Sequence, residues 1–507
     1  MLDPGIDLSP RQTFIVALGL PARDWSFEPL AFLGRGLYIA PHMKILVAIA
    51  SYGTGNDQYL SELVREYRSM SFDVDIVVLS NTQKNVSPGV KVSVVDLHGK
   101  NPWTLPFPHK EIFASHVNDY DLFIYSEDDT LVAEKNLRAF FEVSASLPED
   151  EIPGFLRFEQ GPDGERNFPE VHGHFHWVPE SVQRRNGYVL AFFTNEHAAC
   201  YVLTRSQLRR AIDSGRFLVA PHSEKYDLLC TAATDPYTQC GLRKLICISH
   251  LEDFLVHHLP NKYVGTKFGV NDHELQRQVN ALLRIGSNGH RPASLFETET
   301  KLKDCQYSKS YYETVHPAVL STIPNGARSV LSIGCGWGAT EKALAAKGMR
   351  VVAVPLDPVI AADIETEGIE IVPEDFCEAS ETLKNQRFDC LLLSNVLHLV
   401  RDPIEILSSF GHVLSDNGVA VALVPNLSRL PALWRRISAK EEFGNYEKTG
   451  VHFTSPKTAA SWFESARMRI EGVVHILPAR AEAVGRLGLG LMDPLLSSEF
   501  IVVARRI

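Results

Sequence analysis

The sequence predicts two α/β domains joined by a polar helical connector, and three observations support this fold class. Two series of short apolar strands alternate with helical segments, the first opening at Met43 and the second near Ser329. Buried strands that alternate with helices are typical of parallel sheets. A glycine-rich loop directly follows the first strand of the second series. The expected division is an N-terminal extension (1–42), a first domain (43–290), a connector (291–310) and a second domain (311–507).

Composition narrows the class of protein. The 507 residues are 45% hydrophobic and 22% charged, which is ordinary for a globular chain. The formal net charge is −11 and no long basic run occurs, so we expect no nucleic-acid partner. No apolar run approaches the roughly 18 residues of a membrane span. The eight scattered cysteines form no C-x-x-C pair, which favours a reducing cytoplasm, with the inner face of the membrane as an alternative location.

The first 42 residues are rich in Pro and Gly and have little helical or strand periodicity. Met43 and Lys44 then open a clean apolar strand. We therefore expect Met43 to be the native start and the preceding extension to lack ordered structure. A mass measurement on the protein made by its own host tests this expectation.

The first domain is expected to contain four strands before residue 130. One helix with apolar spacing separates the first two of them. The strands are Ile45–Ala50, Val74–Leu79, Lys91–Val95 and Leu122–Tyr125, and the helix is Gln58–Met70.

Three consecutive carboxylates, Glu127, Asp128 and Asp129, follow the fourth strand. Like charges this close repel unless a cation or hydrogen bonds hold them. Hard divalent cations such as Mg²⁺ or Mn²⁺ bind carboxylate and phosphate oxygens together. The segment resembles the D-x-D signature of GT-A glycosyltransferases of the family 2 type. That resemblance implies a GT-A-like fold and a nucleotide-sugar donor whose diphosphate is bridged by the metal.

Further features of the first domain extend this resemblance. In that family the pair Glu252 and Asp253 would supply the catalytic base, with Asp253 preferred, and His257 or His258 would complete the metal shell or contact phosphate. Glu196–Leu203 resembles the strand that lines the sugar site. His172, His174 and His176 alternate, so a strand would place them on one face. Zinc binding is one interpretation; we favour an acceptor-site or surface loop, because no fourth ligand is evident.

The second domain contains the sharpest motif in the chain. An apolar strand runs into Gly334, Gly336 and Gly338 in a G-x-G-x-G pattern, and a helix follows. Glycines allow a tight turn and a close approach of the backbone to a ligand. Five strands are expected in order: Ser329–Ile333, Arg350–Val354, Glu370–Val372, Asp389–Leu393 and Val419–Val424.

The motif resembles motif I of class I S-adenosylmethionine-dependent methyltransferases, and the ordered strands after it extend the resemblance over about 200 residues. A Rossmann-like domain that binds S-adenosylmethionine is therefore implied. Methyl transfer needs positioning and, for a hydroxyl acceptor, a base. His398 is the preferred base and His452 the second, with a packing role as the alternative for each. Besides the three glycines, the implied cofactor contacts are Tyr312, Asp357, Asp375 and Asn395.

Two positions depart from the family pattern. Ser332 stands where motif I usually has an acidic residue, and Pro355 stands where a carboxylate usually binds the ribose hydroxyls. Losing such a charge-assisted contact weakens cofactor binding by about 1.5–3 kcal/mol. Asp357 is the nearest carboxylate and substitutes if the turn bends back.

The two resemblances together predict a bifunctional transferase. It would transfer a sugar from a nucleotide sugar to a glycan or lipid-linked acceptor and methylate a sugar hydroxyl. Joining the two activities raises the effective concentration of the shared intermediate. Two alternatives are a methyltransferase with a non-catalytic glycan- or nucleotide-binding N-terminal domain, and a glycosyltransferase carrying a degenerate methyltransferase scaffold.

Overall fold

A computed structural model describes most of the chain: residues 43–171, 173–265, 269–292, 295–362, 364–372, 376–430, 432, 445–478 and 492–507. The expected extension (1–42), His172 and the predicted cofactor contact Asp375 lie outside the described residues. None of the helices in the described ranges is long and apolar enough to cross a membrane. The cysteines whose side chains are described are free thiols.

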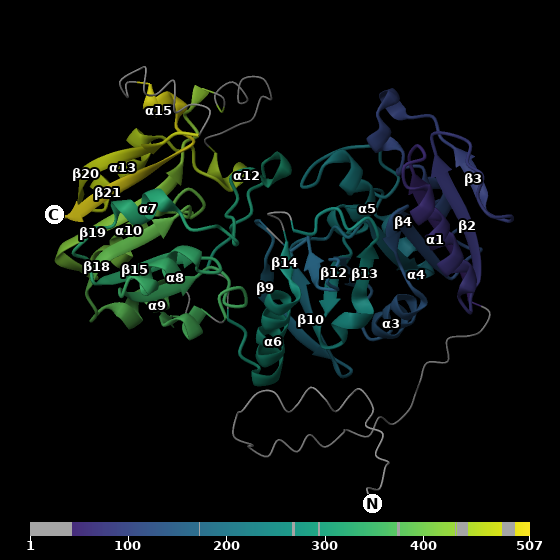
Figure 1. Cartoon of the computed structure of the whole chain (residues 1–507), viewed down its shortest axis with the longest axis horizontal. Helices are drawn as coiled ribbons and strands as arrows, with labels where there is room; N and C mark the ends of the chain where they lie inside the picture. The colour runs from purple at the N-terminus through teal and green to yellow at the C-terminus, as the bar shows by residue number, and fades with distance from the viewer. Residues whose placement is uncertain are drawn as a thin grey trace, which may run out of the picture. The chain divides into compact units, whose positions relative to one another are not determined.

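The N-terminal half begins with a five-stranded sheet in the order β11-β4-β1-β2-β3 (Figure 1). Strands β1 to β4 are parallel and β11 is antiparallel to β4. The bounds are Lys44–Ser51 (β1), Asp73–Ser80 (β2), Lys91–Val94 (β3), Leu122–Glu127 (β4) and Cys200–Thr204 (β11). These strands confirm the expected β-α alternation, because the helix α1 (Asp57–Ser69) lies between β1 and β2 and buries its apolar stripe.

Two further sheets complete the N-terminal half, in the orders β6-β12-β10-β9 and β14-β8-β7-β13-β5. Their strands are Thr130–Leu131 (β5), Glu151–Gly154 (β6), Leu156–Gln160 (β7), Arg166–Phe168 (β8), Trp177–Arg185 (β9), Tyr188–Phe193 (β10), Arg243–Cys247 (β12), Leu255–His258 (β13) and Val270–Asn271 (β14). The helices are His109–Ser115 (α2), Glu134–Ser144 (α3), Arg205–Asp213 (α4), Leu228–Thr238 (α5) and Asp272–Asn288 (α6).

Local sequence explains the boundaries of α6, which lies at the end of the expected first domain (43–290) and before the expected connector (291–310). The Asn271 side chain accepts a hydrogen bond from the Glu274 amide, and Gly289 ends the helix with a φ of 72°. Both are preferred capping residues. His174 lies in a turn and His176 directly precedes β9, so their alternation does not place them on one strand face.

The C-terminal half contains one seven-stranded sheet in the order β17-β16-β15-β18-β19-β21-β20. The five neighbouring strands β17, β16, β15, β18 and β19 are parallel to one another. Strand β21 is antiparallel to both of its neighbours, β19 and β20. The strands are Ser329–Cys335 (β15), Arg350–Pro355 (β16), Ile369–Ile371 (β17), Phe388–Ser394 (β18), Leu414–Pro425 (β19), Met468–Ile476 (β20) and Glu499–Arg506 (β21). Strand order reverses between β15 and β18, which creates the crevice where open α/β sheets bind ligands.

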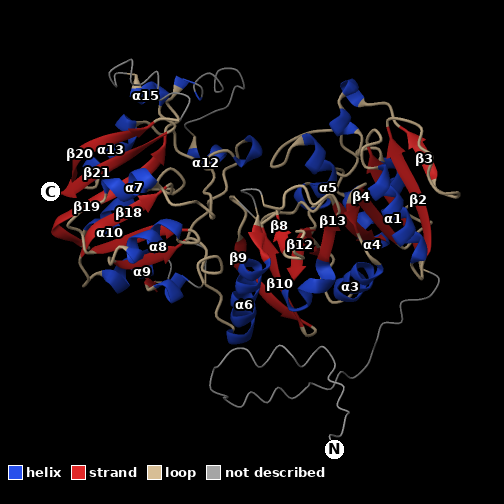
Figure 2. Ribbon diagram, in the orientation of Figure 1, coloured by secondary structure: helices blue, strands red, loops and turns tan. Residues whose placement is uncertain are grey.

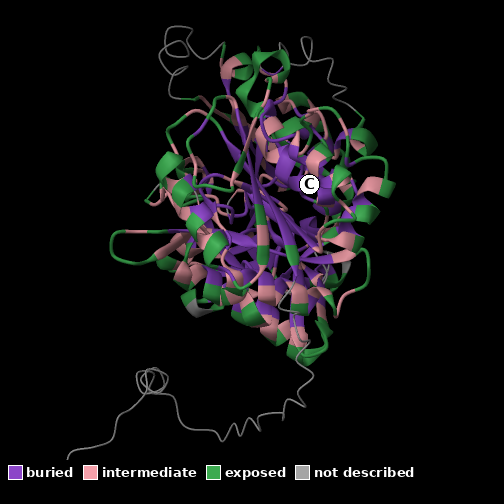
Figure 3. Cartoon of the chain, turned by 90° about the vertical axis from the view of Figure 1, so that its right-hand side faces the viewer, coloured by how far each residue is buried: buried purple, intermediate pink, exposed green. Residues whose placement is uncertain are grey.

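Helices cover both faces of this sheet, as the alternating strand side chains require (Figure 2). On one face, Leu331 and Leu393 pack in a cluster with residues of α10 and α13. On the other, Val330 and Leu392 pack with residues of α7 and α8. Figure 3, in which the N-terminal half faces the viewer, shows buried strands flanked by more exposed helices. The helices are Pro317–Thr322 (α7), Ala339–Ala346 (α8), Phe376–Leu383 (α9), Pro403–Gly411 (α10), Tyr446–Thr449 (α12), Pro456–Ser465 (α13) and Asp493–Leu496 (α15).

Candidate active site

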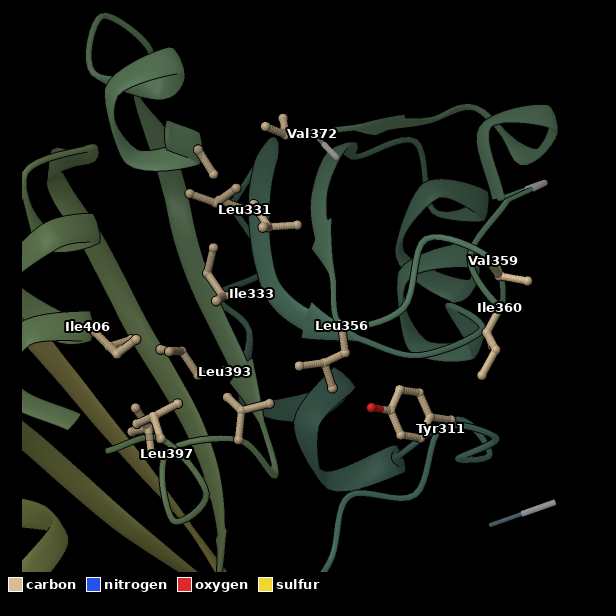
Figure 4. Packing of buried hydrophobic residues seen from close by; sticks show 14 of the residues in the cluster. Tyr311, Leu331, Ile333, Leu356, Val359, Ile360, Val372, Leu393, Leu397 and Ile406 are labelled. Atoms are coloured by element: carbon tan, nitrogen blue, oxygen red, sulfur yellow. The ribbon is translucent and has the colours of Figure 1, made fainter. Parts of the chain in front are cut away.

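The glycine-rich loop joins β15 to α8 and is closed by the segment around Tyr311. Gly334 and Gly338 have φ angles of 79° and 77°, a conformation that favours glycine. A Cβ added to Gly336 would lie 2.0 Å from the Tyr311 carbonyl oxygen. The Trp337 amide donates to this same oxygen at 3.0 Å. Figure 4 shows the buried Tyr311 ring with the core residues of the domain. The loop therefore needs glycine because another backbone segment touches it.

A carboxylate reaches the motif from an unexpected position. The Ser332 hydroxyl donates to the Glu341 carboxylate at 2.6 Å, and Glu341 lies in the first turn of α8. Burial raises the pKa of Glu341. Glu341 on α8 thus places a carboxylate beside Ser332, at the position where the family usually has an acidic residue in motif I. The contact between Glu341 and the loop region was predictable from the sequence, because Glu341 is the third residue of the helix that follows the loop.

A cluster of charged side chains lies at the carboxyl end of β18. The buried Lys309 ammonium donates to the Ser394 carbonyl at 2.8 Å and pairs with Glu313 at 2.9 Å. The Asn395 amide donates to Glu499 at 3.2 Å and to Glu313 at 3.4 Å. The buried Asn395 Oδ1 has no hydrogen-bond partner among the described residues. Lys309 supplies a positive charge, Glu313 and Glu499 supply carboxylates, and Asn395 Oδ1 is an unused hydrogen-bond acceptor. This set of groups suits a ligand that carries both an ammonium and a carboxylate.

The two predicted cofactor contacts near β16 are covered by the N-terminal half. Asp357 is fully buried and accepts hydrogen bonds from the amides of Val359 (2.7 Å), Ile360 (3.3 Å) and Trp177 (3.1 Å). The Tyr312 hydroxyl accepts from Gln278 on α6 at 3.0 Å. Asp357 therefore fixes the turn after β16, and its carboxylate is not exposed to a ligand in this conformation.

Asp357 is expected to make stability fall as pH rises. Burial raises its pKa from 3.8 to about 7, so the folded state binds a proton that the unfolded state releases near pH 4. The stabilising contribution is complete below about pH 4 and is lost as pH rises through about 7. Thermal melts at pH 5 and pH 8 should show a larger decrease for the wild type than for Asp357→Asn. An equal decrease in both proteins would contradict the assignment to Asp357.

His398 and His452 are held by backbone carbonyls. His398 Nε2 lies 2.9 Å from the Tyr307 oxygen, and burial lowers its pKa to about 4, so the ring is neutral near pH 7. Its buried Nδ1 has no hydrogen-bond partner among the described residues. His452 Nε2 lies 3.0 Å from the Val400 oxygen. The structure thus gives both histidines a packing contact, and a base role for either stays a prediction.

In the N-terminal half, hydrogen bonds hold two of the three consecutive carboxylates. Asp128 accepts from the Ser51 hydroxyl (2.5 Å) and the Asn56 amide (2.8 Å). His258 Nε2 lies 3.3 Å from the Asp129 carboxylate. Burial, followed by the charge of Asp129, raises the pKa of Glu127 to about 8. Within the described ranges, no group of three or more His, Cys, Asp or Glu residues is arranged to hold a metal ion.

The remaining predicted residues of this half lie apart from the carboxylates. His257 Nε2 contacts the Asn261 side chain at 3.0 Å, so His258 and not His257 approaches the acidic cluster. Glu252 forms a bidentate ion pair with Arg166 at 2.7 and 2.8 Å. Asp253 precedes β13 whereas His258 ends it, so the length of β13, roughly 10 Å at about 3.3 Å per residue, lies between them. The structure does not bring Asp253 or Glu252 to Asp129.

Comparison with known proteins identifies the second half of the chain. Residues 305–470 match the family model of a methyltransferase domain. The ubiquinone biosynthesis O-methyltransferases of Xylella fastidiosa (strain 9a5c) and Xanthomonas campestris pv. campestris (strain B100) are 28% and 27% identical over 160 and 162 residues. Each match covers 30% of this chain and 65% or 66% of the relative, so the chain spans just under two thirds of their length.

Among solved structures, a SAM dependent methyltransferase from Archaeoglobus fulgidus is 18% identical, with a TM-score of 0.29 over 37% of this chain and 90% of that protein. The matched family model starts at residue 305 and does not concern the N-terminal half, which is α/β and whose GT-A resemblance stays a prediction. Residues 305–470 are a class I S-adenosylmethionine-dependent methyltransferase domain.

Proposed function

We propose that the chain is an S-adenosylmethionine-dependent O-methyltransferase whose N-terminal half binds the methyl acceptor without transferring a sugar. The observation that carries this proposal is the charged cluster of Lys309, Glu313 and Asn395 beside the glycine-rich loop. The names of the curated relatives, which are O-methyltransferases, support an oxygen acceptor.

The charged cluster fits the amino-acid part of the cofactor, whereas Asp357 is not exposed to its ribose in this conformation. Lys309 would bind its carboxylate, Glu313 and the unused Asn395 oxygen would bind its ammonium, and Glu341 keeps Ser332 oriented behind the loop. When bound, the cofactor supplies an electrophilic methyl group on a sulfonium. The chain then has to position the acceptor and exclude water. Tyr311 contributes to that exclusion, because its backbone closes the loop and its side chain is buried.

Calorimetric titration with S-adenosylmethionine tests the proposal. We expect Lys309→Met to weaken binding by about 10- to 100-fold, as a lost charge-assisted contact is worth about 1.5–3 kcal/mol. Lys384→Met is the matched control, because Lys384 is an exposed lysine of the same domain that pairs with Glu381 on its surface. Wild-type protein that binds no S-adenosylmethionine, or equal affinities in the wild type and Lys309→Met, would refute the proposed role of the cluster.

Glycosyl transfer is the second candidate function. It is favoured by the buried Asp128 and Asp129, which lie with Ser51 and Asn56 at the carboxyl ends of the parallel strands β1 and β4. This function predicts that the protein binds a nucleotide sugar and that Asp129→Asn reduces the binding. Titration with UDP-sugars in the presence of Mn²⁺ measures it, and an absence of binding in the wild type would reject the second candidate.

A further inference from the structure

A cavity of about 360 Å³ lies against the outer face of the β9–β10 hairpin. Val178 on β9 and Phe192 on β10 are paired across the hairpin and line it. The connector supplies a second wall through Phe296, Glu297 and Glu299. Its size falls within the range of small-molecule sites, about 300–1,000 Å³.

Tyr311 connects this cavity to the glycine-rich loop. The ring of His176, which lines the cavity, stacks on the Tyr311 ring with centroids 4.7 Å apart. The Tyr311 hydroxyl lies 2.6 Å from the hydroxyl of Thr298, in the connector wall. The Tyr311 carbonyl accepts from the amide of Trp337 in the loop. One residue therefore contacts both the cavity wall and the loop that faces the cofactor.

Lys225 also lines the cavity, but its three donors are already used. Its ammonium lies 3.1 Å from Glu196, 3.1 Å from Glu299 and 2.6 Å from the Thr194 carbonyl. A lysine has three donors in all. A phosphate or carboxylate ligand would have to break one of these contacts and approach the cavity carboxylates, so an anionic ligand is disfavoured.

The other polar groups of the cavity offer hydrogen-bond acceptors. The buried Glu299 Oε1 has no hydrogen-bond partner among the described residues. His176 Nδ1 lies 2.8 Å from the Trp177 carbonyl and must donate to it, which leaves Nε2 as an acceptor on a neutral ring. Burial lowers the pKa of His176, consistent with that neutral form. Glu299 Oε1 and His176 Nε2 are therefore hydrogen-bond acceptors to which a ligand can donate, and the hydroxyl groups of a ligand are suitable donors.

Aromatic side chains complete the lining. Phe192 and Phe296 are half-buried, so part of each ring remains available to an apolar ligand face. A saccharide presents hydroxyl groups at its edge and C–H groups on its faces, which matches this combination.

We propose that this cavity binds a polyhydroxylated unit of the methyl acceptor that carries no anionic group, such as a neutral saccharide unit, an inference that rests on the methyltransferase function proposed above. The N-terminal half then contributes to methyl transfer by holding the acceptor through β9, β10 and the connector. Because Tyr311 stands between this cavity and the glycine-rich loop, the hydroxyl that receives the methyl group belongs to a part of the acceptor outside the cavity.

Saturation-transfer NMR on the full-length protein tests the proposal, with methyl glucoside as the neutral probe and the glycosides of glucuronic acid and glucosamine as charged probes. We expect the neutral probe to bind. Val178→Trp, which fills the cavity, should weaken that binding at least about tenfold. Arg185→Trp is the matched control, because Arg185 is exposed at the far end of the same strand.

Parallel calorimetry with S-adenosylmethionine separates this inference from the proposed function. Cofactor binding should be equal in the wild type and both variants. Cofactor binding without neutral-glycoside binding, binding restricted to a charged probe, or an unchanged signal in Val178→Trp would each overturn the cavity assignment. Val178-dependent glycoside binding without cofactor binding would support the site as a saccharide site and refute the methyltransferase function.

Discussion

Replacing Gly336 with alanine is expected to abolish measurable S-adenosylmethionine binding and to lower the melting temperature of the methyltransferase domain. The added Cβ would lie 2.0 Å from the Tyr311 oxygen and 2.7 Å from its carbonyl carbon. Both atoms belong to the backbone, so they cannot rotate away as the end of a side chain could. Overpacking of this kind costs about 1–3 kcal/mol, which corresponds to roughly 2–12 °C for a domain of this size.

Gly326→Ala is the control for this substitution. Gly326 lies in the turn before β15, in the same domain, and no atom lies within 4 Å of its ideal Cβ. It should retain cofactor binding by calorimetry and the wild-type melting temperature. If Gly336→Ala binds S-adenosylmethionine as the wild type does, the contact between Tyr311 and the loop is not needed to form the site.

The sequence predicted the methyltransferase sheet well because each strand is strongly apolar and the glycine loop has fixed spacing. Strand β15, expected at Ser329–Ile333, extends to Cys335, two residues beyond the apolar run. The antiparallel strand β21 was not predicted, although Phe500–Val503 is apolar. Such a run specifies a strand without specifying its partner or direction.

The site itself was less predictable, because its groups come from segments far apart in the chain. Glu341 reaches Ser332 from the following helix, and Trp177 reaches Asp357 across 180 residues. A sequence motif identifies the residues of one segment that lie near the cofactor. It does not identify the residues of distant segments that fold over that segment. The same limit applies to the acidic cluster, where His258 and not its neighbour His257 approaches Asp129 because strand residues alternate between faces.

Trp177→Ala is expected to cause the largest loss of stability. The side chain is fully buried, packs on the Phe193 ring with centroids 4.7 Å apart, and donates from Nε1 to Gln278 at 2.9 Å. Removing a buried tryptophan costs about 3–5 kcal/mol, and leaving the Gln278 oxygen unpaired adds about 1–3 kcal/mol. Urea unfolding followed by fluorescence and circular dichroism measures the change.

The position of Trp177 makes this loss informative about function. Its backbone amide donates to Asp357, so a displaced β9 would remove one of the three hydrogen bonds that hold the turn after β16. Cofactor affinity should therefore fall together with stability in Trp177→Ala. Trp177→Phe keeps most of the packing and the backbone amide and loses only the Gln278 contact, so it should cost about 1–3 kcal/mol and retain cofactor affinity. Normal cofactor binding by folded Trp177→Ala would instead show that the cofactor site does not depend on the Trp177 side chain.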